Sequence, residues 1–454
     1  MKKQNSNILQ GPVLWGILGY TIPIILTSVL QLLFNAADLV IVGRFCGSIS
    51  EAAVGATGAI TNLIINLFIG LSVGAGVTVA HAIGSREEEA VHRAVHTALP
   101  VALISGVALT GVGVSLAGTL LRLMGTPETV LPLSKIYMQI YFGGITFNMV
   151  YNFSASILRA AGDTKSPLIF LSLAGVINVV LNVIFVTVFH MNVAGVALAT
   201  TLSQGVSAIL VVIALMRRTD GCKLYLKKMR FYRIELLKMV RIGLPAGIQG
   251  SLFSISNVLI QSSINSFGDV FMSGNAAAGN IEGFVYVIMN AFHQTAVNFI
   301  GQNVGAQQYD RVKKALRCCL GCVCVAGLAA GILGYSFGPQ LLSIYITDSA
   351  EAISYGMMRL GIVCLFYFLC GLMDVATGAL RGMGASVEPM IISVLGICGL
   401  RILWIYTIFQ IPALHTPQCL FLSYPISWIV TFAAELIAFR RVYRRHVQLT
   451  EQPQ

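Results

Sequence analysis

The sequence is poor in charge for its size. Only 10% of its 454 residues are charged, and just 18 residues are Asp or Glu. Soluble domains carry about 25% charged residues, whereas hydrophobic residues make up 56% of this chain. So few charged residues cannot cover the apolar side chains of this chain with a polar surface that faces water. The composition therefore excludes an ordinary soluble protein and indicates a lipid bilayer as the solvent.

The chain also lacks several motifs that carry chemistry. It has no Walker A sequence for nucleotide phosphates and no His-Glu-x-x-His sequence for a catalytic zinc ion. Its ten cysteines lie mostly in apolar runs, as small core residues do. We therefore expect neither an enzyme nor a bound cofactor, and no ATP-driven pump.

What the sequence does have is long apolar runs. A membrane-spanning helix needs roughly 20 apolar residues. Twelve segments meet this need, so we predict an all-α membrane protein. The predicted spans are 15–43, 53–81, 94–118, 134–158, 167–189, 194–216, 240–266, 273–300, 315–338, 354–379, 389–411 and 417–439.

Basic residues set the expected orientation, because cytoplasmic loops are enriched in Lys and Arg. All but five of the 29 basic residues fall into the termini and loops of one side. Four are expected in outer loops (Arg44, Arg122, Lys135 and Arg359), and Arg401 lies inside a span. Both termini are thus predicted to be cytoplasmic, in a multi-pass protein of the inner (plasma) membrane. The net charge of +11 then reflects topology rather than nucleic-acid binding.

The two halves of the chain resemble each other at an offset of about 221 residues. Leu158-Arg-Ala-Ala-Gly-Asp-Thr-Lys-Ser-Pro167 matches Leu380-Arg-Gly-Met-Gly-Ala-Ser-Val-Glu-Pro389, as Leu-Arg-x-x-Gly-x-x-x-x-Pro. We predict an N-terminal lobe (1–216), a cytoplasmic linker (217–239) and a C-terminal lobe (240–454). Six spans per lobe make two parallel six-helix bundles, related by a pseudo-two-fold axis along the membrane normal.

Taken together, these motifs resemble the multidrug and toxic compound extrusion (MATE) transporters over almost the whole chain. The residues that carry the resemblance are the two repeated loops, Pro23 with Asp38 fifteen residues later, Asn178-Val-Val-Leu-Asn182, and Gly195-Val-Ala-Leu-Ala-Thr200-Thr-Leu-Ser-Gln204. The resemblance implies a cation-coupled antiporter. Such proteins exchange Na⁺ or H⁺ for organic, often cationic, drugs and toxic compounds. A monomer in the lipid bilayer is expected.

Asp38 is the sharpest candidate for the coupling ion, because ionisable groups inside spans are usually functional. Counting roughly 1.5 Å per helical residue places Asp38 about 9 Å from the outer end of its span. The same count places Asn178, Asn182 and Thr200 at similar depth in the first lobe. A carboxylate with amide and hydroxyl oxygens suits Na⁺, and the carboxylate can also carry a proton. The alternative is that Asp38 only hydrogen-bonds a neighbouring helix.

Two further features bear on this site. Pro23 lacks a backbone donor and is expected to act as a hinge in the helix of Asp38. The position of Asn182 is typically Asp in proton-coupled prokaryotic family members. Asp38 is therefore the only acid of the predicted cluster, which leaves the choice between Na⁺ and H⁺ open.

The second lobe holds Glu282 and Asp374 as candidates for binding a cation or substrate. Either could instead pair with Arg401, and Asp374 could pair with Arg381. His293 is expected to be packed and satisfied. Aromatic and methionine side chains suit an adaptable drug cavity. The candidates are Tyr141, Phe147, Met149, Phe153, Tyr286, Met289, Tyr367 and Phe368, although ordinary packing is the simpler interpretation for most of them.

Two rival functions remain at this stage. The first is a lipid-linked oligosaccharide flippase of the same superfamily, which usually has more helices and a cationic cavity. The second is a membrane-embedded enzyme or receptor-like protein. Twelve spans and few basic residues inside them, mainly Arg401, argue against the first rival. The missing catalytic motifs argue against the second.

Overall fold

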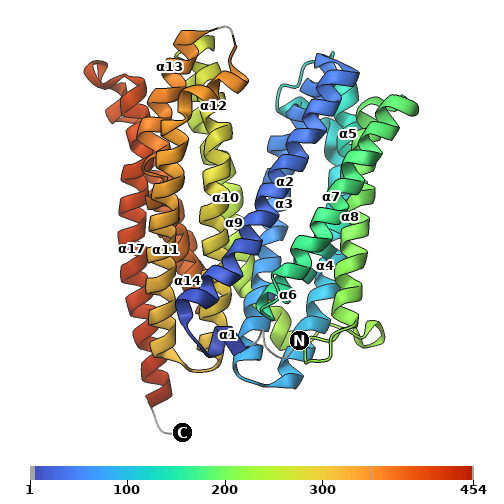
Figure 1. The fold of residues 1–454 in the computed structure, drawn as a ribbon, viewed down its shortest axis with the longest axis vertical. Coiled ribbons are helices and arrows are strands. Elements are labelled where there is room, and N and C mark those ends of the chain that lie inside the picture. Colours follow the sequence, from blue (N-terminus) through green and yellow to red (C-terminus); the bar gives the residue numbers. More distant parts are fainter. Residues whose placement is uncertain (1–5, 348, 452–454) are drawn as a thin grey trace. The chain divides into compact units, whose positions relative to one another are not determined.

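The computed structural model describes residues 6–347 and 349–451, and this part of the chain consists of helices and short connections (Figure 1). The first half begins with α1 (Ser6–Leu9). It continues with α2 (Val13–Cys46), α3 (Ser48–Gly84), α4 (Glu88–Leu123), α5 (Leu131–Gly143), α6 (Ile145–Ala160), α7 (Lys165–Val183), the π-helix η1 (Ile184–Val188), α8 (Asn192–Met216) and the short η2 (Leu226–Lys228).

The second half begins with α9 (Arg233–Asn265) and ends with the long helix α17 (Pro417–Glu451). Between them lie α10 (Asp269–Gly305), α11 (Tyr309–Ser336), α12 (Gly338–Tyr345), α13 (Ala350–Arg359), the π-helix η3 (Leu360–Cys364), α14 (Tyr367–Gly382), α15 (Val387–Ser393), the π-helix η4 (Val394–Gly399), α16 (Leu400–Tyr406), η5 (Ile408–Gln410) and η6 (Pro412–Leu414).

Each predicted span coincides with a helix or with a broken run of helices. Eight helices of the described residues are long and apolar enough to cross a membrane, and a ninth candidate is the pair Ala350–Cys364 and Tyr367–Gly382, bent by 41°. The predicted span 134–158 is split into α5 and α6 at Gly144. A Cβ at Gly144 would lie 2.1 Å from Cγ2 of Thr201, so glycine lets α8 approach closely at this break.

The internal repeat predicted from the sequence is present in the backbone. Helices α3 and α10 both have 37 residues and follow a glycine with positive φ, Gly47 at 87° and Gly268 at 92°. Left-handed backbone recurs after the same helices, at Arg86 (φ 60°) and Gln307 (φ 56°). The two Leu-Arg-x-x-Gly motifs also match, since φ is 85° at Gly162 and 83° at Gly384.

The chain forms two compact units whose limits fall inside helices. One unit runs from Leu26 to Ser251, and the other joins Ser6–Ile25 to the chain from Leu252 onward. Helix α2 therefore begins in the second unit and enters the first between Ile25 and Leu26, whereas the predicted lobes separate at the linker. The second unit holds this first segment firmly, because Arg311 Nε donates to Ile8 O at 2.9 Å.

Close backbone packing joins α3 to the first part of α9 within the first unit. Lipid gives helices little hydrophobic reason to associate, so small residues that permit close contact are favoured. A Cβ at Gly70 would lie 2.2 Å from Gly247 N, and one at Gly74 would lie 2.2 Å from Met239 O. A larger side chain at any of these glycines would force the two helices apart.

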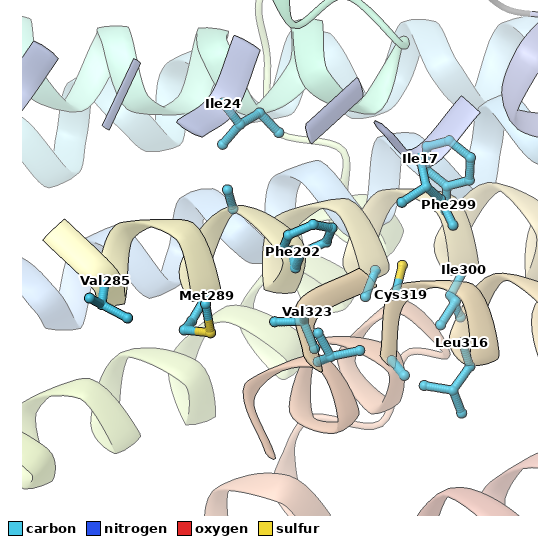
Figure 2. Packing of buried hydrophobic residues seen from close by; sticks show 14 of the residues in the cluster. Ile17, Ile24, Val285, Met289, Phe292, Phe299, Ile300, Leu316, Cys319 and Val323 are labelled. Atoms are coloured by element: carbon cyan, nitrogen blue, oxygen red, sulfur yellow. The ribbon is translucent and has the colours of Figure 1, made fainter. Parts of the chain in front are cut away.

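The core of the second unit packs the start of α2 against α10 and α11 (Figure 2). Ile17 and Ile24 lie in one buried cluster with Phe292, Phe299 and Val323. Two further contacts add specificity. The rings of Tyr20 and Phe299 meet edge to face at 5.4 Å, and the Thr21 and Thr295 hydroxyls lie 2.8 Å apart. The first three turns of α2 thus belong to the packed core of this unit.

Candidate cation-coupling site

Asp38 lies in the part of α2 that belongs to the first unit, and its side chain is only 9% exposed. The predicted neighbours come from α7 and α8, which pack against each other. Asn178 and Asn182 share one face of α7 because they are four residues apart. The structure thus brings all four predicted residues of the first lobe together, from three helices.

Hydrogen bonds join these four side chains into one network. Asn182 Nδ2 donates to Asp38 Oδ1 at 2.5 Å, and Thr200 Oγ1 donates to Asp38 Oδ2 at 3.3 Å. Asn178 Nδ2 donates to Thr200 Oγ1 at 3.3 Å, and Asn178 Oδ1 accepts from Asn182 Nδ2 at 3.3 Å. Both carboxylate oxygens of Asp38 therefore accept a hydrogen bond from a neutral group.

The site offers oxygen atoms and a single formal charge. Among the described residues, none of the ion pairs with N···O distances up to 4.0 Å involves Asp38. Asn182 is fully buried, and its Oδ1 has no hydrogen-bond partner in the described part of the chain. Buried amide oxygens are normally satisfied. The set of one carboxylate, amide carbonyls and a hydroxyl suits a hard monovalent cation or a proton.

Local backbone geometry changes directly after Asn182. Helix α7 ends at Val183 and continues as the π-helix η1, followed by His190 and Asn192 with φ of 52° and 53°. Short π-helical segments inside α-helices are often found at functional sites. Two further π-helices, η3 and η4, directly follow Arg359 and Ser393. Each of these three π-helices therefore begins within two residues of a buried polar side chain, which is Asn182 for η1.

Pro23 lies inside α2, two residues before the chain passes from one unit to the other. Proline removes one helical hydrogen bond and weakens the helix locally. Pro245 occupies the matching place inside α9, which also passes between units, after Ser251. The predicted hinge residue therefore lies near the limit between the two compact units, with Asp38 about 22 Å further along the helix.

Glu282 forms a buried ion pair with Arg359 in the second unit. Arg359 Nε and Nη2 donate to the two carboxylate oxygens, each at 2.8 Å, and Arg359 Nη1 donates to Asn275 Oδ1 at 2.5 Å. The expectation that Arg359 lies in an outer loop is therefore wrong. Arg359 ends α13 and is buried, and the Glu282 carboxylate holds it there.

Arg401 does not pair with Glu282 or Asp374, so that suggested pairing is wrong for the described residues. Its Nε donates to Ser427 Oγ at 2.9 Å, and its guanidinium lies 4.2 Å from the centre of the Tyr424 ring. An aromatic face offers a buried cation partial compensation. With Arg359 and Arg381, the second unit buries three arginines, more than the sequence analysis expected inside spans.

Asp374 lies on the face of α14 that also carries Arg381, within electrostatic range of its guanidinium. His293 contacts both of these residues of α14. Its Nδ1 lies 2.7 Å from Asp374 O and its Nε2 lies 3.3 Å from Arg381 Nη1, so Nδ1–H donates and Nε2 accepts. His293 is thus neutral and satisfied, as expected. Asp374 Oδ2 has no hydrogen-bond partner among the described residues.

Glu435 on α17 is a buried acid that the sequence reasoning missed. Its side chain is fully buried, and its Oε1 accepts from Thr377 Oγ1 at 2.7 Å and from Ser393 Oγ at 2.8 Å. Its Oε2 has no partner in the described part of the chain. The signal was available, because Glu435 is an ionisable residue inside the predicted span 417–439.

The eight aromatic and methionine candidates for the drug cavity fall into two groups. Met149, Phe153 and Met289 are fully buried among core side chains, so their assignment to a cavity lining is wrong for this structure. The others keep some exposure and remain candidates, namely Tyr141, Phe147, Tyr286, Tyr367 and Phe368.

The chain contains one sequence pattern that is typical of hydrolases. Gly70-Leu-Ser72-Val-Gly74 has the spacing of a nucleophile elbow, which needs a sharp strand-to-helix turn. Here it lies in the middle of α3, and Ser72 Oγ donates to Ile69 O at 2.7 Å. The pattern therefore marks close helix packing rather than a catalytic serine.

Comparison with known proteins agrees with the repeated architecture. The family model MatE matches the chain twice, over residues 23–184 and 245–407. The chain belongs to the MatE family. Both matches begin at an intrahelical proline, Pro23 or Pro245, so the two copies of the family unit are the two halves of the predicted repeat.

Individual relatives cover most of the chain. The probable multidrug resistance protein YpnP of Bacillus subtilis is 29% identical over 86% of this chain and 87% of its own length. The probable multidrug resistance protein NorM of Thermotoga maritima is 26% identical over 66% of each chain. The FAD transporter of Shewanella oneidensis is 25% identical over 65% of this chain and 66% of its own.

Solved MATE structures share the whole fold. A MATE protein in complex with MaL6 superposes with a TM-score of 0.90 over 100% of both chains at 22% identity. A multidrug resistance MATE transporter in an outward-facing conformation gives 0.89 over 99% of both chains at 22% identity. The predicted all-α fold with twelve membrane segments is therefore confirmed. This MatE protein is a multi-pass membrane transporter of small molecules and not an enzyme.

Proposed function

We propose that this MatE protein is an antiporter that exports organic, often cationic, compounds in exchange for Na⁺ or H⁺ bound at Asp38. The observation that carries the proposal is the charge of the site. Asp38 is buried, its hydrogen-bond partners are neutral, and no basic group of the described residues lies within 4.0 Å of it. A buried charge without a partner is costly, so a cation stabilises this site more than any other state of it.

The hydrogen bonds of Asn182 depend on whether the Asp38 carboxylate is ionised, protonated or bound to Na⁺. An amide can donate through Nδ2 to a carboxylate or accept through Oδ1 from a protonated carboxyl group. With Asp38 ionised, Nδ2 donates and Oδ1 has no partner among the described residues. A proton on Asp38, or a Na⁺ ion bound between the two residues, would give Oδ1 a partner and so reorganise α2 against α7.

Helix α2 connects this event to the second unit. Its first turns pack with α10 and α11, whereas Asp38 packs with α7 and α8. Occupancy of the site would change the preferred bend of α2 near Pro23 and shift the balance between access states. A ligand shifts such a balance only by its different affinity for the two states.

Other residues of the chain are assigned to substrate binding and to a second charged site. Substrate contacts are assigned to the partly exposed aromatic residues Tyr141, Phe147, Tyr286 and Tyr367. Asp374 is a second acid for cation or substrate, whereas Glu282 is committed to Arg359. The chain works as a monomer in the plasma membrane with both termini in the cytoplasm, as the distribution of Lys and Arg indicates.

Export of ethidium from proteoliposomes, driven by Na⁺ or H⁺ gradients imposed separately, tests the proposal. The wild type should respond to at least one gradient, and Asp38→Asn should lose that response. Asp163→Asn is the matched control, since Asp163 is an acid of the α6–α7 loop that bonds Ser166. Undiminished gradient-driven export by Asp38→Asn would show that Asp38 does not bind the coupling cation.

A further inference from the structure

The linker between α8 and α9 carries an unusual surface of mixed basic and apolar side chains. We define this basic linker surface as the exposed side chains of residues 225–241. Its basic members are Lys227, Lys228, Arg230, Arg233, Lys238 and Arg241, all exposed. Its apolar members are Tyr225, Leu226, Phe231, Ile234 and Leu237, which are 43–64% exposed.

Hydrogen bonds to α4 hold the backbone of the basic linker surface in place. The backbone N–H of Tyr225 donates to His96 Nε2 at 3.0 Å, and that of Arg230 donates to His96 O at 3.3 Å. Tyr232 N–H donates to Thr97 Oγ1 at 3.2 Å. All of these residues belong to the first unit, so the basic side chains are presented on a fixed base.

The two acidic residues of the linker are already paired with arginines. Glu235, the one acid between residues 225 and 241, is buried and pairs with Arg93 at 2.8 Å. Asp220 is held by Arg218 through a charged hydrogen bond. The exposed basic side chains therefore form a net positive surface that no acid of the linker compensates.

The apolar side chains continue into a stripe along α9. Its apolar members are Ile234, Leu237, Leu244 and Ile248, and Arg241 lies on the same face. These five residues follow one another at spacings of three and four, and all five are exposed. An exposed apolar stripe on a membrane helix is suited to contact with lipid. Arg233, Lys238 and Arg241 lie at the beginning of this stripe, where we expect the lipid headgroups.

We propose that the basic linker surface binds anionic phospholipid headgroups at the membrane surface. Basic residues attract anionic lipid, while interleaved Phe, Leu and Ile side chains enter the boundary with the acyl chains. A purely polar partner such as a nucleic acid would leave the apolar members exposed. The inference concerns lipid and holds whether or not transport is coupled to a cation.

Direct binding to the full chain in a neutral detergent tests the proposal. The probes are dioctanoyl phosphatidylglycerol, dioctanoyl phosphatidylcholine and inorganic phosphate, titrated against the thermal unfolding midpoint. Phosphatidylglycerol should stabilise the wild type, and the other two should not. The variant Lys227→Gln/Lys228→Gln/Arg230→Gln should bind phosphatidylglycerol roughly tenfold or more weakly.

The matched control neutralises three exposed arginines of α17, as Arg441→Gln/Arg444→Gln/Arg445→Gln. It should keep the affinity of the wild type within about twofold. Equal phosphatidylglycerol affinity in the wild type and the linker variant would overturn the proposal. So would a phosphatidylcholine or phosphate effect as large as that of phosphatidylglycerol.

A measurement on the wild type alone tests the proposal even if the linker variant does not fold. Hydrogen exchange of the backbone amides from residue 225 to residue 234 should slow on addition of phosphatidylglycerol and not of phosphatidylcholine. Unchanged exchange in this segment at saturating phosphatidylglycerol would contradict lipid binding at this surface.

Discussion

Asp38 in the first unit and Glu282 in the second unit are buried in opposite electrostatic environments. In the first unit, one acid without a basic partner meets only amides and a hydroxyl. In the second unit, Glu282 and Glu435 are buried together with Arg359, Arg381 and Arg401, and Glu282 pairs with Arg359. The first arrangement can change its net charge by binding one cation, whereas an ion pair such as Glu282–Arg359 is already neutral.

The difference separates two uses of charge inside a membrane protein. Removing one member of a buried ion pair leaves the other unpaired and is strongly destabilising. Removing a lone acid removes an unpaired charge, so the fold loses little while any dependence on a cation disappears. We therefore expect substitutions in the second unit to act on stability and those around Asp38 to act on coupling.

The largest expected effect on stability comes from Arg359→Met, which leaves Glu282 buried without its partner. The loss should be about 3–5 kcal/mol in the free energy of unfolding. The double variant Glu282→Gln/Arg359→Met should recover much of it, because no uncompensated charge remains. Unfolding in detergent measures both. An Arg359→Met protein as stable as the double variant would show that the pair is not a structural ion pair.

A smaller loss is expected for Glu435→Ala, which leaves the hydroxyls of Thr377 and Ser393 without their shared acceptor. Two buried unsatisfied donors cost about 2–4 kcal/mol together. Glu435→Gln keeps an oxygen for both hydroxyls and should remain within about 1 kcal/mol of the wild type. Equal stability of the Ala and Gln variants would mean that the two hydrogen bonds do not hold α14 and α15 to α17.

At the first site, Thr200→Ala should weaken cation dependence without removing it. Thr200 donates one hydrogen bond of 3.3 Å to Asp38, and such a bond contributes about 1 kcal/mol, or roughly fivefold in apparent affinity. Thr201→Ala is the matched control, because Thr201 Oγ1 donates to Ile140 O instead. The half-saturating Na⁺ or H⁺ concentration for export measures the difference, and equal shifts in both variants would remove Thr200 from the site.

The smallest effect is expected at the edge of the first unit, where Arg218 and Asp220 form a partly exposed ion pair. Burial alone would raise the pKa of Asp220, but the hydrogen bond and charge of Arg218 outweigh it and hold that pKa below its ordinary value. A lowered pKa stabilises the fold at neutral pH, and this contribution is lost as the pH falls toward and below the ordinary Asp range.

Asp220→Asn should therefore reduce the thermal unfolding midpoint slightly at pH 7, and by progressively less as the pH falls below the ordinary Asp range. The comparison with Arg359→Met measures how much burial adds to an ion pair. A difference between Asp220→Asn and the wild type that grows as the pH falls would contradict the lowered pKa of Asp220.

The sequence predicted that the four residues of the candidate site lie near one another, because their positions follow simple rules. Hydropathy predicted the helices, a residue count predicted similar depths for the four residues, and a spacing of four predicted one shared face for Asn178 and Asn182. It could not establish the hydrogen bonds between them, because the rotation of α2 relative to α7 and α8 depends on tertiary packing.

The second unit was harder to predict because two of its buried charged residues, Arg359 and Glu435, lie near the ends of the predicted spans, and Arg359 is held by an ion pair with Glu282. Arg359 was read as a loop residue, although it lies inside the predicted span 354–379, since a basic residue near the end of a span usually marks the membrane surface. Glu435 was overlooked beside the basic end of α17. The limits of the two units inside α2 and α9 leave no mark in hydropathy, because both helices continue unbroken across them.

Ethidium export by Asp38→Asn and by Glu282→Gln/Arg359→Met, measured in the same proteoliposomes under the same ion gradient, tests the central claim most directly. Both variants remove buried charge without leaving an unpaired partner. The account predicts that Asp38→Asn loses gradient-driven export and that the double variant retains it. Export that survives in Asp38→Asn and fails in the double variant would place the coupling charge in the second unit and contradict the account.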